Sequence, residues 1–331
     1  MKTTIAIRGN VTGMDAVVLA GGYATRLWPV TRHRPKMLLP VGEVTVIDRI
    51  LQSLEDDDRV ETVYVSTNER FAEQFTQHLG AYSYEKAQLS VEESIEENEK
   101  LGVIGALAQL VDREQLTDDL LVVAGDNLLG FELAEFLDFF EARDGSALAA
   151  YDVGSSEEAS SYGIVELAGE RVVDFREKPA NPPSTLASIA CYAFRAEDVR
   201  FQEYLESDNN PDEPGWFVEW LQAREPVYAF TFDGEWFDIG TPENYLRAVQ
   251  WALAGEALIA ESATVEQSDI GKNVHVMADA VVRESTLENS LVFPGATVEQ
   301  SDLRDSIVDR EALVRNLALS GALVGAHSQL P

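Results

Sequence analysis

The sequence is poor in cysteine, lysine and long apolar runs. Cys191 is the only cysteine among 331 residues, which excludes a disulfide within the chain. No apolar run of 18 residues and no signal peptide are present, so we expect a cytoplasmic protein without a membrane partner. Only six of the 25 basic residues are lysines, and the 58 acidic residues give a formal net charge of -33.

The acidic residues are spread along the whole chain, a pattern that is typical of proteins from molar salt. At an ionic strength of about 1 M the Debye length is about 3 Å, so an acidic surface does not repel itself strongly. We therefore predict a halophilic protein. Its pI of 4.3 argues against binding to nucleic acid or to anionic membranes.

One segment departs from this acidity. Residues 16–42 contain no Asp or Glu, but they carry Arg26, Arg32, Arg34 and Lys36. Gly21 and Gly22 precede Thr25 and Arg26, a spacing that lets backbone N–H groups and a forked cation face a phosphate. A turn that simply requires glycine is the alternative. Neither GxxxxGK[ST] nor GxGxxG is present, which excludes a Walker loop and the dinucleotide fingerprint.

Residues 15–255 alternate short β-branched runs with amphipathic segments. Residues 16–20, 61–66 and 120–126 are predicted strands, and 69–79 and 132–142 are predicted helices. This rhythm predicts an α/β fold with a Rossmann-like, mixed and mostly parallel sheet. Ligands bind such sheets beyond the carboxyl ends of the strands.

The last part of the chain is a repeat of sixteen residues. Val276, Val292, Val308 and Val324 share one column, and two further columns hold Val282, Val298 and Val314 and Leu287, Leu303 and Leu319. Steps of six, five and five residues predict three short strands per coil, each with one side chain in a narrow core. We therefore divide the chain into an extension (1–13), a catalytic domain (14–255) and a β-helix (256–331). The last coil has no charged cap, so we expect another chain to cover it. This predicts a homo-oligomer, with the β-helix as a candidate interface.

Several motifs between residues 15 and 255 resemble one family, the sugar-1-phosphate nucleotidylyltransferases. LAGGYATRLWPVT is similar to its LAGGxGTRLxPLT signature. The other similar segments follow in the family's order: RPKMLLPV (34–41), GVIGAL (102–107), AGDN (124–127), YGIVE (162–166), FREKP (175–179) and GEWFDIGTPENYLRA (234–248). The repeat resembles the β-helical tail of long family members, which favours a left-handed solenoid that spacing alone does not establish.

The resemblance implies that a sugar-1-phosphate attacks the α-phosphorus of a nucleoside triphosphate and releases pyrophosphate. Because the nucleophile is already an anion, the protein needs cations and alignment rather than a general base. The four histidines accordingly form no catalytic constellation. Asn127 after Asp126 favours dTTP or UTP with glucose-1-phosphate, the thymidylyltransferase activity EC 2.7.7.24.

The resemblance also implies a role for each matching residue. Arg26, Lys36 and Asp126 are the catalytic residues, with Arg26 on the triphosphate and Lys36 near the α-phosphate. Asp126 and Asp238 are expected to hold Mg²⁺, because two carboxylates from distant segments can share one such ion. The nucleotide is expected at Leu19, Ala20, Gly21, Gly22, Thr25, Arg26, Gly102 and Gly105. The sugar phosphate is expected at Asn127, Tyr162, Gly163, Glu177 and Lys178.

This chain departs from the family pattern at a few positions. Ala24 replaces the third glycine of the signature, so a positive φ there would strain the loop. Ser188 and Ala190 lie where the family often has NxGxY, and Val103 and Ile104 replace the TA of GTAGAL.

Three alternatives stay open. One is a mannose-1-phosphate guanylyltransferase, and another is a catalytically silent regulatory relative, which would be expected to lack Arg26, Lys36, Asp126 or Asp238. The third is an acyltransferase of the hexapeptide-repeat type, for which His275 and His327 are the only candidate bases.

Overall fold

The computed structural model describes residues 13–92 and 101–331, so nearly all of the predicted extension (1–13) lies outside the described residues. The chain forms two compact units. Unit 1 comprises the described residues of 1–20, 50–124 and 130–234, and unit 2 comprises 21–49, 125–129 and 235–331. The predicted domain boundary at residue 255 stays a prediction. No helix in the described part of the chain is long and apolar enough to cross a bilayer.

Unit 1 contains a nine-stranded sheet in the order β5-β4-β1-β6-β11-β8-β12-β10-β9. Its strands are β1 (Met14–Leu19), β4 (Val60–Thr67), β5 (Ala87–Val91), β6 (Leu120–Ala124), β8 (Ser146–Asp152), β9 (Gly163–Ala168), β10 (Arg171–Glu177), β11 (Leu186–Phe194) and β12 (Val227–Thr231). Strands β5, β4, β1 and β6 are parallel neighbours, and β12 is parallel to β8. The other pairings are antiparallel, so the sheet is mixed.

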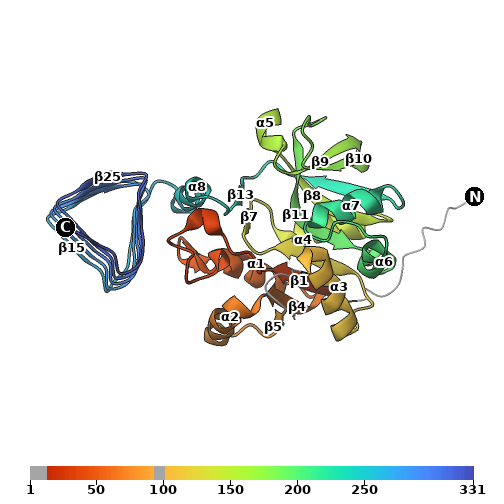
Figure 1. The fold of residues 1–331 in the computed structure, drawn as a ribbon, viewed down its shortest axis with the longest axis horizontal. Helices are drawn as coiled ribbons and strands as arrows, with labels where there is room; N and C mark the ends of the chain where they lie inside the picture. Colours follow the sequence, from red (N-terminus) through yellow and green to blue (C-terminus); the bar gives the residue numbers. More distant parts are fainter. Residues whose placement is uncertain (1–12, 93–100) are drawn as a thin grey trace, which may run out of the picture. The chain divides into compact units, whose positions relative to one another are not determined.

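The helices of unit 1 are α2 (Glu69–Ala81), α3 (Gly102–Glu114), α4 (Leu133–Glu141), α5 (Ser156–Ala159), α6 (Phe201–Glu206) and α7 (Pro214–Gln222), while α1 (Val46–Glu55) crosses the boundary between the units. The predicted strands and helices are confirmed in type and differ only at their ends. The mixed sheet between helices confirms the Rossmann-like α/β fold (Figure 1).

Helices cover both faces of this sheet. On one face α3, α6 and α7 bury an apolar core with alternate strand residues such as Val122 and Ala229. Phe230 points to the other face, because successive side chains of a strand alternate, and there its ring packs against Phe136 of α4 at 5.9 Å between centroids.

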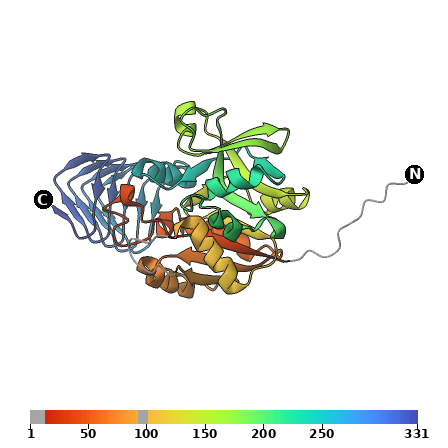
Figure 2. The same cartoon turned by 45° about the vertical axis from the view of Figure 1, so that its right-hand side comes forward.

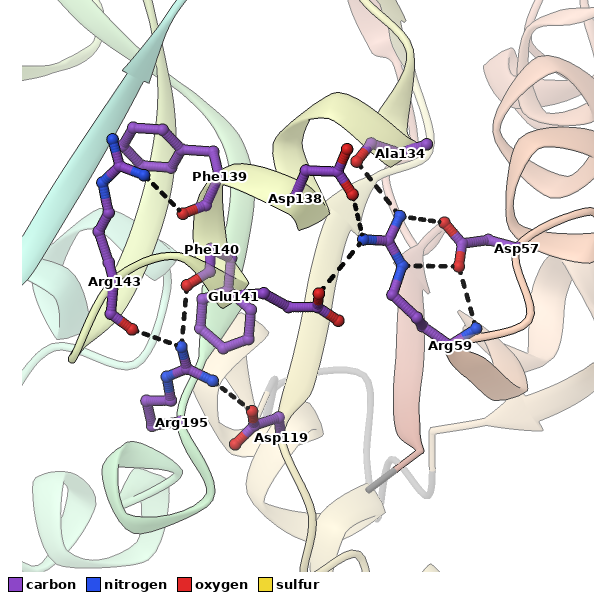
Figure 3. A network of polar contacts seen from close by, with 10 residues as sticks. All are labelled: Asp57, Arg59, Asp119, Ala134, Asp138, Phe139, Phe140, Glu141, Arg143 and Arg195. Atoms are coloured by element: carbon purple, nitrogen blue, oxygen red, sulfur yellow. Dashed lines mark hydrogen bonds and ion pairs between the residues drawn. The ribbon is translucent and has the colours of Figure 1, made fainter. Parts of the chain in front are cut away.

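Two arginines attach α4 to the rest of unit 1 (Figure 3). Arg59 donates to the Asp138 carboxylate at 2.6 Å and to the Ala134 carbonyl at 3.2 Å. At the other end of the helix, Arg195 donates to the Phe140 carbonyl at 2.8 Å and lies over its ring. The last carbonyls of a helix have no partner within it, so Arg195 both satisfies this end and neutralises its partial charge.

Unit 2 begins where the chain leaves β1 and β6. It contains the hairpin β2 (Pro40–Val41) and β3 (Val44–Thr45), the antiparallel pair β7 (Asn127–Leu129) and β13 (Trp236–Asp238), helix α8 (Pro242–Leu253) and two short 3₁₀ turns, Thr25–Leu27 and Lys36–Leu38. Thr241 caps α8 by accepting a hydrogen bond from the N–H of Asn244. An apolar core joins these parts to the strands that follow.

Those strands form three parallel sheets, which confirm the β-helix. Figure 1 views it end on as a triangle, and Figure 2 shows the coils stacked. The first sheet holds β14 (Leu258–Ile259), β17 (His275–Val276), β20 (Leu291–Val292), β23 (Ile307–Val308) and β26 (Leu323–Val324). The second holds β15 (Thr264–Glu266), β18 (Val281–Arg283), β21 (Thr297–Glu299), β24 (Leu313–Arg315) and β27 (Gln329–Leu330). The third holds β16 (Asp269–Ile270), β19 (Thr286–Glu288), β22 (Asp302–Arg304) and β25 (Ala318–Ser320).

The predicted columns are the pairing register of the β-helix. Val276, Val292 and Val308 are paired in successive coils and have no exposed surface. The corners hold two features that the apolar spacing did not indicate. Residues there take positive φ in every coil, as at Asn289 (47°), and buried serines such as Ser301 accept an N–H from the next coil. The serines satisfy backbone donors that the short strands leave unpaired at the turns.

Candidate active site

Lys36 lies between two carboxylates in unit 2. It begins the turn Lys36–Leu38, its side chain is buried, and its Nζ forms an ion pair with Asp126. The same Nζ lies 3.9 Å from Oδ1 of Asp238. The structure thus brings together three predicted residues from three separate segments of the chain.

The β7–β13 pair sets this arrangement. Asp238, the last residue of β13, lies opposite Asn127, the first residue of β7, so Asp126 immediately precedes the ladder. The N–H of Ile239 donates to the carbonyl of Asp126 at 3.0 Å, which extends the pairing by one position. Asn127 itself is buried, with 3% of its surface exposed.

The two carboxylates crowd one another. Burial raises the pKa of Asp238, and the neighbouring charge of Asp126 raises it further, while Lys36 and Arg26 lower it. A carboxyl pair of this kind favours an added cation, because the cation stabilises both ionised forms.

Arg26 lies beside the same carboxylate. A Cβ at Gly240 would lie 3.0 Å from Nη2 of Arg26 and 3.3 Å from Oδ2 of Asp238, so the absence of a side chain there leaves room for both groups. Thr25, Arg26 and Gly22 are exposed, and all three can therefore meet a ligand from solvent.

In the glycine-rich loop, the residue in the left-handed backbone conformation is an alanine. Ala24 has φ 47° and ψ 47°, whereas neither Gly21 nor Gly22 has a positive φ. The strain expected at Ala24 is thus present in the structure. Leu19 and Ala20 precede this loop in unit 1, where Ala20 is held by hydrogen bonds to Ser66 and Thr67.

Four of the five residues predicted to bind the sugar phosphate, Tyr162, Gly163, Glu177 and Lys178, lie in unit 1 at the ends of β9 and β10. Gly163 pairs with Glu177, and the N–H of Lys178 donates to the carbonyl of Tyr162 at 3.1 Å. These four residues are therefore neighbours, and their role in binding the sugar phosphate stays a prediction. A Cβ at Gly163 would lie 2.7 Å from Oε2 of Glu177, and one at Gly215 would overlap with the same oxygen. The absence of side chains at both glycines leaves room for the Glu177 carboxyl in this position.

Glu177 is surrounded by negative charge that the sequence did not indicate. Burial raises its pKa to about 7, Lys178 opposes this, and Glu213 and Glu219 add to it. Its backbone N–H donates to Oε2 of Glu219 at 2.9 Å. Glu213 forms an ion pair with Lys178, which has φ 45°. Glu213, Gly215 and Glu219 precede or lie on α7, far from FREKP in the sequence, and only the tertiary structure reveals them.

Gly102 and Gly105 lie in the first turns of α3. Gly102 has φ 69°, and a Cβ there would overlap with the carbonyl oxygen of Pro211. That carbonyl accepts the N–H of Ile104 at 2.9 Å and so satisfies one of the free donors of this helix end. The glycine is required for this close approach of two backbone segments.

The carboxylate pair also bears on the predicted metal. Among the described residues, no group of three or more His, Cys, Asp or Glu side chains could hold a metal ion. Asp126 and Asp238 nevertheless supply two oxygen donors within reach of one ammonium group. Mg²⁺ is commonly held by one or two carboxylates together with substrate phosphates, so the pair fits this ion.

The comparison with known proteins shows which family the chain belongs to. The profile described as nucleotidyl transferase matches residues 15–254, and the chain belongs to this family. It is 31% identical over 285 residues to a protein of Sulfolobus acidocaldarius named "Putative mannose-1-phosphate guanyltransferase", covering 84% of this chain and 76% of that protein.

Other relatives show how far the likeness extends. The chain is 25% identical over 280 residues to the bifunctional protein GlmU of Methanocaldococcus jannaschii, an alignment that covers 83% of this chain but only 61% of that protein. A crystal structure from Bacillus anthracis, named as a "Putative Glucose-1-Phosphate Thymidylyltransferase" in complex with a sucrose, superposes with a TM-score of 0.63 at 22% identity. It covers 72% of this chain and 95% of that one. At this identity the structural likeness shows the fold alone.

Proposed function

We propose that this protein transfers a nucleotidyl group from a nucleoside triphosphate to a hexose-1-phosphate. The observation that carries the proposal is the buried Lys36 beside Asp126 and Asp238, with Arg26 next to them, in a member of the nucleotidyl transferase family. In this proposal the cations and the carboxylate pair lie beside the two phosphate groups that react.

In the proposed reaction an oxygen of the sugar phosphate forms a bond to the α-phosphorus. The bond from that phosphorus to the bridging oxygen of the β-phosphate breaks, and the electron pair leaves with pyrophosphate. No proton has to move, so the protein's work is to align the groups and offset the repulsion between them. Lys36 is assigned to the α-phosphate and Arg26 to the leaving pyrophosphate. Mg²⁺, when held by Asp126 and Asp238, would supply further positive charge.

We assign the sugar phosphate to the residues at the ends of β9 and β10. Lys178 would exchange its exposed partner Glu213 for the phosphate, and Glu177 would bind sugar hydroxyls, with Tyr162 and Gly163 beside it. A carboxyl whose pKa lies near 7 can donate as well as accept a hydrogen bond to a hydroxyl. Gly102 and Gly105 are assigned to the nucleobase on the resemblance alone, because the carbonyl of Pro211 fills the space beside Gly102.

Two substrate pairs require separate tests. Asn127 after Asp126 supports dTTP or UTP with glucose-1-phosphate. The 31% identity to the protein named as a mannose-1-phosphate guanyltransferase supports GTP with mannose-1-phosphate. The motifs do not separate them, because stacking and backbone contacts carry much of base recognition.

The test is a screen for pyrophosphate release in molar KCl with Mg²⁺. It crosses dTTP, UTP, GTP and ATP with the 1-phosphates of glucose, mannose, galactose and N-acetylglucosamine. We expect one or two combinations to turn over. If none does while the folded protein binds triphosphate, the chain is the silent relative. Transfer from acetyl-CoA would instead support the acyltransferase alternative.

The homo-oligomer, the halophilic habit and the cytoplasmic location stay predictions from the sequence. Light scattering in molar KCl tests the first, with a mass above the 36.5 kDa of one chain as the expected result.

A further inference from the structure

One cation of the acid-free segment faces the β-helix and not the carboxylate pair. The guanidinium of Arg34 forms an ion pair with Asp309 and lies 4.6 Å from the ring centroid of Phe293. Its Nε donates to the carbonyl of Val30 at 3.1 Å. Asp309 directly follows β23, and Phe293 directly follows β20, so both partners belong to adjacent coils of the β-helix.

The contact is buried. Asp309 has 2% and the Arg34 side chain 14% of its surface exposed. Oδ1 of Asp309 also accepts the N–H of Arg310 at 2.7 Å. A buried carboxylate is costly without a partner, and a forked guanidinium that also covers an aromatic ring meets this need better than a lysine would.

Other residues of the acid-free segment also pack against the β-helix. Val30, Leu39 and Val41 belong to one apolar core with Leu291 and Ile307 of the β-helix.

Two further contacts lie at the ends of this segment. The hydroxyl of Tyr245 in α8 donates to the carbonyl of Pro40 at 2.8 Å. A Cβ at Gly325 would lie 2.9 Å from Cβ of Pro29, so a coil also approaches the segment closely there.

Lys36 is two residues from Arg34, and the residue between them is Pro35. Proline holds φ near −65°, and here it is −67°, so the short link has little freedom. A displacement of Arg34 would therefore move the start of the turn Lys36–Leu38.

We propose that Arg34 is a positioning residue, which holds Lys36 at the Asp126–Asp238 pair by anchoring its segment on Asp309 and Phe293. The consequence for turnover rests on the proposed function, which assigns Lys36 to the α-phosphate. The β-helix then helps to position a residue of the proposed active site, Lys36, and is not only an appended domain.

The experiment compares Arg34→Gln, Asp309→Asn and the double variant in the full chain, in molar KCl. Arg315→Gln is the matched control, because it removes an ion pair to Glu299 in which the arginine is exposed on the β-helix. Lysine acetylation by an N-hydroxysuccinimide ester, read by mass spectrometry, reports on Lys36 without any substrate. Lys86, whose Nζ donates to the carbonyl of Asp57 at 2.7 Å in unit 1, is the internal reference.

We expect Lys36 to be acetylated about tenfold faster in both single variants, the factor that corresponds to the loss of one charge-assisted hydrogen bond. The rate at Lys86 stays unchanged. With an active substrate pair, kcat falls by about the same factor while KM for the sugar phosphate is kept. The double variant loses no more than either single one, since both remove the same link.

Unchanged acetylation of Lys36 in both single variants overturns the proposal, and so does an additive loss in the double variant. Arg34→Lys, which keeps the charge, is expected to restore part of kcat and of the protection of Lys36. If Arg34→Gln does not fold, Asp309→Asn and Arg34→Lys carry the same test. A wild-type protein without turnover, in which Arg34→Gln still exposes Lys36, contradicts the proposed function and leaves the positioning role supported.

Discussion

Asp238 lies directly opposite Asn127 in the antiparallel pairing of β13 with β7. This register brings Asp238 and Asp126, the residue before Asn127, close to Lys36, although the three segments are far apart in the sequence. The relative positions of the charged groups in the site therefore depend on the short β7–β13 ladder.

Replacing either carboxylate tests that arrangement. We expect Asp126→Asn and Asp238→Asn each to lower turnover by about a hundredfold or more, because each removes charge from a site that acts by electrostatics. Pyrophosphate release measures the loss. Asp302→Asn, an exposed change on the β-helix, should keep full turnover. Near-normal activity in Asp126→Asn would remove that residue from the mechanism.

Magnesium binding has a readout of its own. A ligand at 100 times its Kd stabilises the folded state by about 2.7 kcal/mol, so Mg²⁺ should raise the melting temperature in constant molar KCl. We expect the rise in the wild type and in Asp302→Asn, and its loss in Asp238→Asn. Equal rises in all three would indicate diffuse binding to the acidic surface. Chelation with EDTA should abolish turnover, and added Mg²⁺ should restore it.

Glu177 should make stability depend on pH. Its pKa is about 7 in the folded protein, against an ordinary value of 4.5 for an unfolded chain, so the folded state binds the proton more tightly. Its contribution is therefore full below pH 4.5 and is lost as the pH rises to 7, by up to about 3 kcal/mol. Denaturant unfolding of Glu177→Gln between pH 5 and 8 measures this: the variant should gain on the wild type as pH rises. Glu166→Gln on β9 is the control, and an identical pH dependence in Glu177→Gln would refute the assignment.

His275 should act in the opposite direction. Burial lowers its pKa to about 4 from 6.5, so the unfolded chain binds a proton that the folded protein does not. The stability is present above pH 6.5 and is lost as pH falls towards 4, by up to about 3 kcal/mol. His275→Leu introduces the residue found at the paired position Leu291 in the next coil. At pH 5 this variant should have a larger free energy of unfolding than the wild type. His327→Asn changes an exposed histidine and should leave the acid sensitivity as it is.

Replacing either of two alanines with glycine should stabilise the folded protein. Ala24 and Ala190 have φ of 47° and 53°, a region that costs an L-residue about 1–2 kcal/mol. Part of the gain is offset by the added freedom of glycine in the unfolded chain, so we expect each change to stabilise by about 0.5 kcal/mol. Thermal unfolding measures it. Ala108→Gly, in α3, should instead destabilise by about 1 kcal/mol.

The acidic composition predicts stabilisation by salt. With a net charge of -33, the melting temperature should rise steadily between low and molar KCl, because screening reduces repulsion within the folded chain. A melting temperature that does not change with KCl would refute the halophilic prediction.

The sequence by itself determined the α/β sheet and the β-helix, because their patterns are local. Short β-branched runs specify the strands and an apolar period of sixteen specifies the coils, and the columns of Val276 and Val282 reappear as buried ladders. The resemblance also named the charged residues Arg26, Lys36, Asp126 and Asp238 before their geometry was known.

The tertiary structure alone decided which charges face each other. No periodicity couples Arg34 to Asp309 or Glu213 to Lys178, because such pairs depend on how distant segments pack. The same holds for Gly215 under the Glu177 carboxyl. An arginine in the sequence can bind a phosphate or anchor a loop. Only its burial and its distances in the structure distinguish the two roles.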